Sequence, residues 1–139
     1  MDSEQALAKT MLARVGSQQE ALQKLQKVVA WMSVNKGRED VATIQARMCL
    51  ANAHLLNGNI DEAVPALRLL LSILNRTRGE SDYLTFELTV LLVQALGSEK
   101  RTVAEARTII TELRPRIARV LGPHHRLTKI TEEWNAYWR

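Results

Sequence analysis

Aromatic side chains, cysteine and long apolar runs are all scarce in this sequence. Its 139 residues include three tryptophans, two tyrosines, one phenylalanine and one cysteine. The apolar stretch 66–74 is interrupted by Arg68 and Ser72, so it falls short of the roughly 18 residues that a membrane-spanning helix needs. The acidic and polar segment 1–10 lacks the basic and apolar regions of a signal peptide. A single cysteine forms no internal disulfide, and we therefore expect a reducing, cytoplasmic location.

The rest of the composition is that of a folded globular domain. Hydrophobic residues make up 46% of the chain and charged residues 24%, which excludes a disordered or collagen-like polypeptide. A chain of this length buries roughly 70% of the surface that its unfolded form exposes. We expect a single domain over residues 1–139.

A net charge of +4 raises nucleic-acid binding as an alternative function, because phosphate contacts need clustered lysine and arginine. The clustering is only partial, since acidic residues are scattered along the chain and few aromatic residues accompany the arginines. A run of charges of this kind is usually a solvated helix face. The residues that would serve the alternative are Arg107, Arg114, Arg116, Arg119 and Arg126.

The chain contains an internal repeat. Intervals of 42 and then 43 residues separate the members of three sets, which are Glu20, Glu62 and Glu105; Gly37, Gly79 and Gly122; and Thr43, Thr85 and Thr128. Independent markers that share one period indicate a repeat architecture. We expect repeats at about 1–39, 40–81 and 82–124, followed by a half-repeat at 125–139.

Each repeat is predicted to form two helices. Ser17, Asn59 and Thr102 each precede a glutamate by three residues, which is the pattern of a capping box at the start of a second helix. Glycine near residues 37, 79 and 122 ends these helices at the lowest conformational cost, and Pro115 predicts a kink in the last of them. Apolar residues recur at helical spacing, and the expected helices are 3–15, 18–35, 41–57, 60–77, 82–96, 103–121 and 125–138, with no strand.

These patterns resemble the tetratricopeptide repeat (TPR) in its 42-residue, kinesin-light-chain-like form. The segment 50–63, with Leu50, Ala51, Gly58, Glu62 and Ala63, is similar to the Leu-Ala…Gly…Glu-Ala core of that family. The segment 121–128 is similar to its Leu-Gly-x-x-His-Pro-x-Thr linker, with His125-Arg126 in place of His-Pro. The resemblance implies an all-α, right-handed α-α superhelix of about three helical hairpins and a C-terminal helix.

The resemblance also implies a function, because stacked hairpins of this type expose a concave face that binds other proteins. The expected partner is a peptide or helical segment of another protein, with acidic segments favoured. Lys and Arg of a carboxylate clamp are missing, so a chaperone-type clamp is not expected. The groove residues carried over from the family are Thr10 and Ala13 in the first repeat, Gln45, Met48, Asn52 and Leu55 in the second, Glu87, Val90 and Gln94 in the third, and Glu133 and Tyr137 in the half-repeat.

No catalytic or metal-binding constellation stands out, and we expect neither an enzyme nor a cofactor. Cys49 follows helical spacing and is expected to pack as a small hydrophobic residue. His124 and His125 are adjacent in a linker with no third ligand nearby, and His54 occupies a position that is aromatic in the family.

Two tryptophans at the end of the chain leave one question open. Trp134 and Trp138 are four residues apart and so share one face of the final helix. They either pack back on the third repeat or form an exposed C-terminal interface that binds a partner or a second copy of the chain. A homodimer through this face, and a purely architectural role, are therefore further possibilities.

Overall fold

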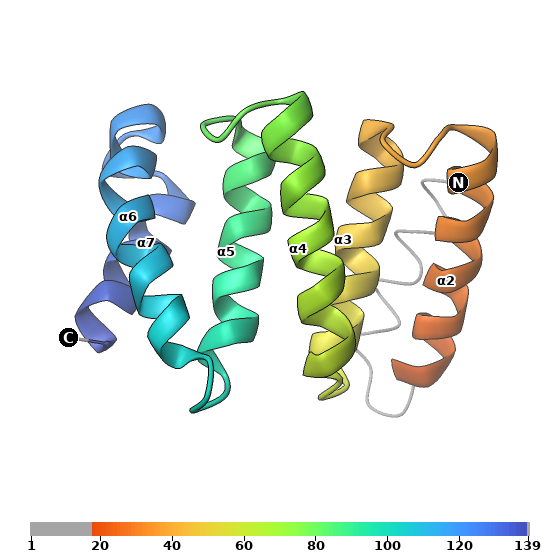
Figure 1. Cartoon of the computed structure of the whole chain (residues 1–139), viewed down its shortest axis with the longest axis horizontal. Helices are drawn as coiled ribbons and strands as arrows, with labels where there is room; N and C mark the ends of the chain where they lie inside the picture. Colours follow the sequence, from red (N-terminus) through yellow and green to blue (C-terminus); the bar gives the residue numbers. More distant parts are fainter. Residues whose placement is uncertain (1–17, 139) are drawn as a thin grey trace. The chain divides into compact units, whose positions relative to one another are not determined.

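The computed structural model describes residues 18–138, which form six α-helices and no strand (Figure 1). The all-α prediction is confirmed, and each helix predicted from residue 18 onward begins and ends within one residue of its observed bounds. The first predicted helix, 3–15, lies outside the described residues. The observed helices are α2 (Gln18–Asn35), α3 (Val41–Leu56), α4 (Ile60–Thr77), α5 (Tyr83–Gly97), α6 (Val103–Leu121) and α7 (Arg126–Tyr137). None of these six combines the length and the apolar character that crossing a bilayer requires.

The chain divides within α4 into two compact units, Met1–Leu70 and Leu71–Arg139. In the first unit, α2 and α3 run antiparallel and pack against each other (Figure 1). Two groups of buried side chains join them. One group is Leu22, Leu25 and Ala53 with Cys49 and Leu50 packed against it, and the other is Val28, Met32 and Ala46 with Val29 and Ala42.

The second unit contains the helices α5, α6 and α7. Helix α5 packs against α6 and α7, and α6 and α7 also contact each other. Most of the α5 side chains are buried, whereas α6 buries a single stripe at helical spacing. That stripe consists of Ala106, Ile110, Leu113 and Ile117. Ala106 is fully buried, as are Ala21 and Ala63 at the same position of the earlier repeats, in keeping with close helix crossing there.

The same hydrogen-bonded turn leads into α3, α5 and α7. Gly37, Gly79 and Gly122 have φ angles of 97°, 92° and 88°, so the glycines predicted to end the preceding helices do adopt the positive-φ conformation. Three residues later, a side chain caps the next helix by accepting a backbone N–H. These bonds are Ala42 N–H to Asp40 (3.0 Å), Leu84 N–H to Asp82 (3.1 Å) and Leu127 N–H to His125 Nδ1 (3.1 Å).

A buried threonine completes each turn. The Thr85 hydroxyl donates to the Gly79 carbonyl at 2.8 Å, and the Thr128 hydroxyl donates to the Gly122 carbonyl at 2.7 Å. The equivalent Thr43 hydroxyl donates to the Met32 carbonyl at 3.4 Å. The repeated threonine therefore ties the start of one helix to the end of the previous one.

Two details of α6 refine the expectations. The capping box predicted at Thr102 is wrong, because its side chain makes no capping hydrogen bond. Its hydroxyl instead donates to the Leu96 carbonyl and holds the turn between α5 and α6. Pro115 lies inside α6, which continues as one helix from Val103 to Leu121.

Candidate protein-interaction surface

The predicted groove residues of α3 form one stripe along that helix. Gln45, Met48, Asn52 and Leu55 are spaced by three or four residues, which places them on one face. Gln45 is exposed, and the other three are half-buried. Because α3 also buries Thr43, Ile44, Ala46, Ala51 and Ala53 against its neighbours, its backbone is held in place while this stripe stays accessible. We call these four residues the α3 stripe.

The equivalent residues of the second unit differ in exposure. On α5, Gln94 is exposed and Glu87 is half-buried, but Val90 is buried at 8% exposure and contributes little accessible surface. On α7, Glu133 is exposed and Tyr137 is 82% exposed. Thr10 and Ala13 lie outside the described residues.

The C-terminal tryptophans are half-buried. The indoles of Trp134 and Trp138 stack with centroids 5.9 Å apart, and Tyr137 meets Trp138 edge-on at 6.4 Å. A Cβ built on Gly97 would lie 2.5 Å from Cζ2 of Trp138, so this indole rests directly on the last turn of α5. Trp138 therefore packs against α5 of the third repeat.

The exposed side chains of α7 are mostly polar. Lys129, Glu132, Glu133 and Ala136 are all exposed. Their equivalents one period earlier on α5 are Phe86, Thr89, Val90 and Val93, which are buried. The solvent-facing side of α7 therefore carries mostly polar residues where α5 carries buried ones, with Tyr137 as an exposed aromatic among them.

Two of the five arginines considered for nucleic-acid binding are paired with carboxylates. Arg114 Nη1 lies 3.3 Å from Glu132, and Arg116 Nη1 lies 3.2 Å from Glu80. Each pair joins α6 to another part of the second unit. These contacts reduce the positive charge that a phosphate backbone would meet.

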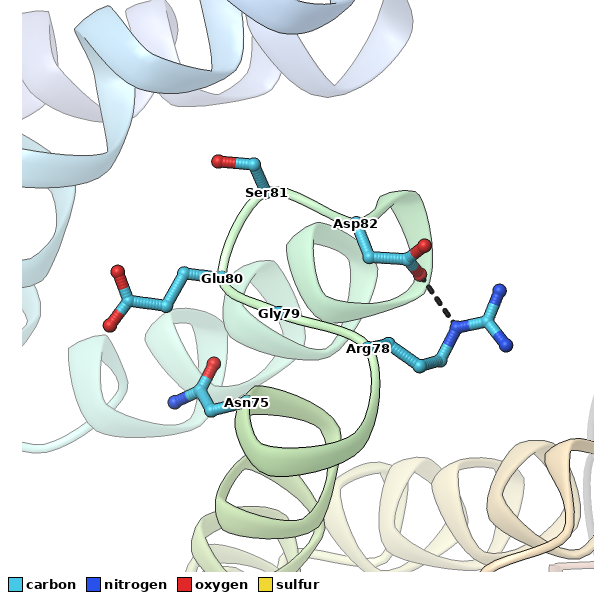
Figure 2. Close-up of a pocket in the computed structure, with 6 residues that line it drawn as sticks. All are labelled: Asn75, Arg78, Gly79, Glu80, Ser81 and Asp82. Atoms are coloured by element: carbon cyan, nitrogen blue, oxygen red, sulfur yellow. Dashed lines mark hydrogen bonds and ion pairs between the residues drawn. The ribbon is translucent and has the colours of Figure 1, made fainter.

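The turn between α4 and α5 forms an open, polar hollow of about 740 Å³ (Figure 2). Figure 2 shows Ser81 pointing away from the turn, while Arg78 and Asp82 approach each other. Arg78 Nε donates to Asp82 at 2.9 Å, and this bond, helped by the Leu84 N–H, lowers the pKa of the Asp82 carboxyl below its ordinary value. The hollow is lined by Asn75 at the end of α4 and by residues of this turn, of which Asp82 caps α5 and Glu80 pairs with Arg116.

Three further residues of α3, Arg47, Cys49 and His54, are half-buried. Cys49 is half-buried beside the Leu22 cluster, as expected of a small hydrophobic residue. The Nδ1 atom of half-buried His54 is enclosed without a hydrogen-bond partner. Burial and the neighbouring Arg38 lower the pKa of Arg47, whose Nη1 donates to the Arg38 carbonyl at 3.3 Å. Within residues 18–138, no three His, Cys, Asp or Glu side chains come together as metal ligands.

Solved structures of TPR-like repeats are similar in fold to this chain. Over 98% of this chain superposes on the nearly identical TPR-like repeats of a Podosopora anserina protein assigned as a kinesin light chain, with a TM-score of 0.88 and 24% identity. The fold is that of TPR-like repeats. A point variant of the same protein gives the same TM-score and identity. This chain spans 64% and 63% of the lengths of those two solved chains.

Likeness at the level of sequence is much weaker. No protein-family model matches the chain. No curated protein is similar enough to count as a relative. The resemblance noted in the sequence is therefore confirmed as a fold, and TPR-like folds carry different ligands through the side chains that each one exposes.

The structure adds one set of residues that the motif analysis missed. Asp40, Asp82 and His125 cap the first helices of successive hairpins, whereas the sequence drew attention to the second helices. The available signal was the recurrence of a cap-forming side chain three residues before each of the repeated threonines.

Proposed function

We propose that this protein is a non-enzymatic interaction scaffold of the cytoplasm, which binds an extended or helical segment of a partner protein along the first helices of its hairpins. TPR-like folds are in general scaffolds for protein interaction, and function in such folds resides in exposed side chains on a rigid frame. The α3 stripe carries the proposal.

The chemistry of the α3 stripe suits a peptide ligand. The amides of Gln45 and Asn52 each donate and accept hydrogen bonds, as the backbone of an extended segment requires. Half-buried Met48 and Leu55 flank Asn52 and offer apolar contacts that adapt to the shape of a partner side chain. In the second unit, Gln94 repeats the amide of Asn52 at the equivalent position of α5.

Selection of peptides tests the proposal directly. A library of random 12-residue peptides displayed on phage is panned against the full chain, and the affinities of the selected peptides are measured by fluorescence anisotropy. Replacing Gln45 and Asn52 together with alanine removes two hydrogen-bonding groups. At about 1 kcal/mol for each bond, the affinity is expected to fall on the order of tenfold or more.

Ser72→Ala is the matched control, because Ser72 is an exposed polar residue on the second helix of a hairpin. Its affinity for the same peptides is expected to equal that of the wild type. Failure to enrich any peptide, or equal affinities for the wild type and the Gln45 and Asn52 double variant, would contradict the proposed site.

A further inference from the structure

A small pocket lies between α6 and α7 of the second unit. Its volume is about 230 Å³, and its lining residues are Arg107, Ile110, Thr111, Asn135 and Trp138. Of these, the sequence assigned Arg107 to the nucleic-acid alternative and Trp138 to a possible C-terminal interface, and it assigned the other three to no surface. We call it the α6–α7 pocket.

The repeat itself shows that this pocket replaces a solid core. Two repeats earlier, the same positions of α2 and α3 are the packed apolar group of Leu22, Leu25, Ala53, Cys49 and Leu50. Their counterparts on α6 and α7 are, in the same order, Arg107, Ile110, Trp138, Trp134 and Asn135. Only Ile110 keeps an aliphatic side chain. Four of the five positions therefore depart from the repeat, and three of these departures, Arg107, Asn135 and Trp138, line the pocket.

A further departure from the repeat, at Gly97, holds the aromatic wall of the pocket in place. Gly97 stands where α3 has Leu55, and it has no side chain to obstruct the Trp138 indole. A Cβ at this position would lie 2.5 Å from Cζ2 and 2.7 Å from Cη2 of Trp138. Glycine inside a helix costs roughly 0.5–1 kcal/mol relative to alanine. Trp134 stacks on the Trp138 ring at 5.9 Å. The indole is thus supported by both α5 and α7.

The polar groups of the pocket suit a negatively charged ligand. Within residues 18–138, the Arg107 guanidinium has no carboxylate in ion-pair contact, unlike those of Arg114 and Arg116. The Asn135 amide supplies a second donor. The Thr111 hydroxyl donates to the Arg107 carbonyl at 2.9 Å, so Arg107 and Asn135 are the donors that would meet an anion. Guanidinium groups bind carboxylates through paired hydrogen bonds, and the Ile110 floor and Trp138 wall favour an apolar group beside the charge.

We propose that the α6–α7 pocket binds a small organic carboxylate that carries an aromatic or branched aliphatic group. The carboxylate pairs with Arg107 and Asn135, and the apolar group lies against Trp138 above Ile110. The volume of about 230 Å³ is below the roughly 300–1,000 Å³ of pockets for larger ligands, so a small acid matches its size. This site is separate from the α3 stripe and does not depend on the proposed partner binding.

Nuclear magnetic resonance of the full chain tests the site with phenylacetate, isovalerate and the neutral amide of each acid. The indole N–H signals of Trp134 and Trp138 report on the pocket, and that of Trp31, on α2, is an internal reference. Both acids are expected to shift the Trp138 signal saturably and to leave Trp31 unchanged. The affinity of each amide is expected to be lower than that of its acid by about tenfold or more, because the amide lacks the charge-assisted bond.

Two variants and one control decide the outcome. Arg107→Gln is expected to weaken acid binding about tenfold, whereas Arg119→Gln, which removes an exposed arginine elsewhere on α6, is expected to change it less than about twofold. Asn135→Leu restores the aliphatic residue of Leu50 and Leu92 and is expected to abolish binding in a folded protein. Shifts that do not saturate by about 10 mM, equal effects of the acids and amides, or equal losses in the two arginine variants would overturn the proposal.

Discussion

Removing the Asp82 carboxylate tests whether the repeated turn stabilises the fold as its geometry indicates. Asp82 accepts the Leu84 N–H at 3.1 Å and the Arg78 Nε–H at 2.9 Å. Asp82→Ala deletes both interactions, while Asp82→Asn keeps a side-chain oxygen for the helix cap and loses the charge. The two variants therefore separate the cap from the ion pair.

The expected magnitudes follow from these two contacts. Loss of a cap costs about 1 kcal/mol, within a range of roughly 0.5–2 kcal/mol. The Arg78 side chain is 40% exposed, so the ion pair contributes only about 0.2–1 kcal/mol. We expect Asp82→Ala to lower the free energy of unfolding by about 1.5 kcal/mol and Asp82→Asn by about 0.5 kcal/mol.

The pH dependence has a definite sign. The Arg78 hydrogen bond, with a smaller contribution from the Leu84 N–H, lowers the pKa of Asp82 in the folded state below the 3.8 of a free carboxyl, although burial acts in the opposite direction. The ionised carboxylate therefore stabilises the fold above the unfolded pKa, and this contribution is lost as the pH falls through the folded pKa. The stability gap between wild type and Asp82→Asn should close on acidification.

Urea unfolding followed by circular dichroism at pH 7 and at about pH 3 measures these differences. If Asp82→Asn is as unstable as Asp82→Ala at pH 7, the cap contributes nothing and the reasoning is refuted. A gap between wild type and Asp82→Asn that widens at low pH would refute the linkage argument.

Three further predictions concern the second unit. His125→Asp gives α7 the capping residue of the other two turns and a negative charge at its N-terminus, so it should raise the unfolding free energy by about 0.5 kcal/mol. His125→Ala removes the cap and should lower the unfolding free energy by about 1 kcal/mol. Thermal unfolding of the two variants distinguishes these signs. Gly97→Ala places a methyl group against the Trp138 ring, so the indole should move into solvent and tryptophan emission should shift to longer wavelength. An unchanged emission spectrum would show that the indole does not rest on Gly97. The polar outer side of α7 predicts a monomer in sedimentation equilibrium at tens of micromolar; a dimer that Tyr137→Glu dissociates would restore the C-terminal interface.

Helix bounds were predictable because their signals are local. The 3.6-residue periodicity of Leu22, Leu25 and Val28, together with a glycine near residue 37, is enough to define α2 from sequence. The same reasoning failed at Thr102, where the hydroxyl binds the Leu96 carbonyl at the end of the preceding helix. The capping pattern considers only residues of the helix that it begins, so it does not take into account a carbonyl of the preceding helix that binds the same hydroxyl.

The candidate surfaces were less predictable because they depend on what lies beside each helix. The resemblance to the TPR family placed Val90 on the predicted groove face, but Val90 is buried in the structure. The predicted helix 82–96 stopped short of Gly97, whereas Gly97 ends α5 and contacts the indole of Trp138, 41 positions later in the chain. The pocket at Arg107, Asn135 and Trp138 became recognisable only when the repeat was compared with the packed group around Leu22.

Site-specific photo-crosslinking inside cells tests the central claim of partner binding along the first helices most directly. A benzophenone amino acid replaces Gln45 or Gln94, which are exposed on first helices, or Ser72 as a control on a second helix. The account predicts that positions 45 and 94 each crosslink to a partner protein, identified by mass spectrometry, and that position 72 does not. Equal crosslinking at all three positions, or crosslinks to the partner from position 72 alone, would contradict it.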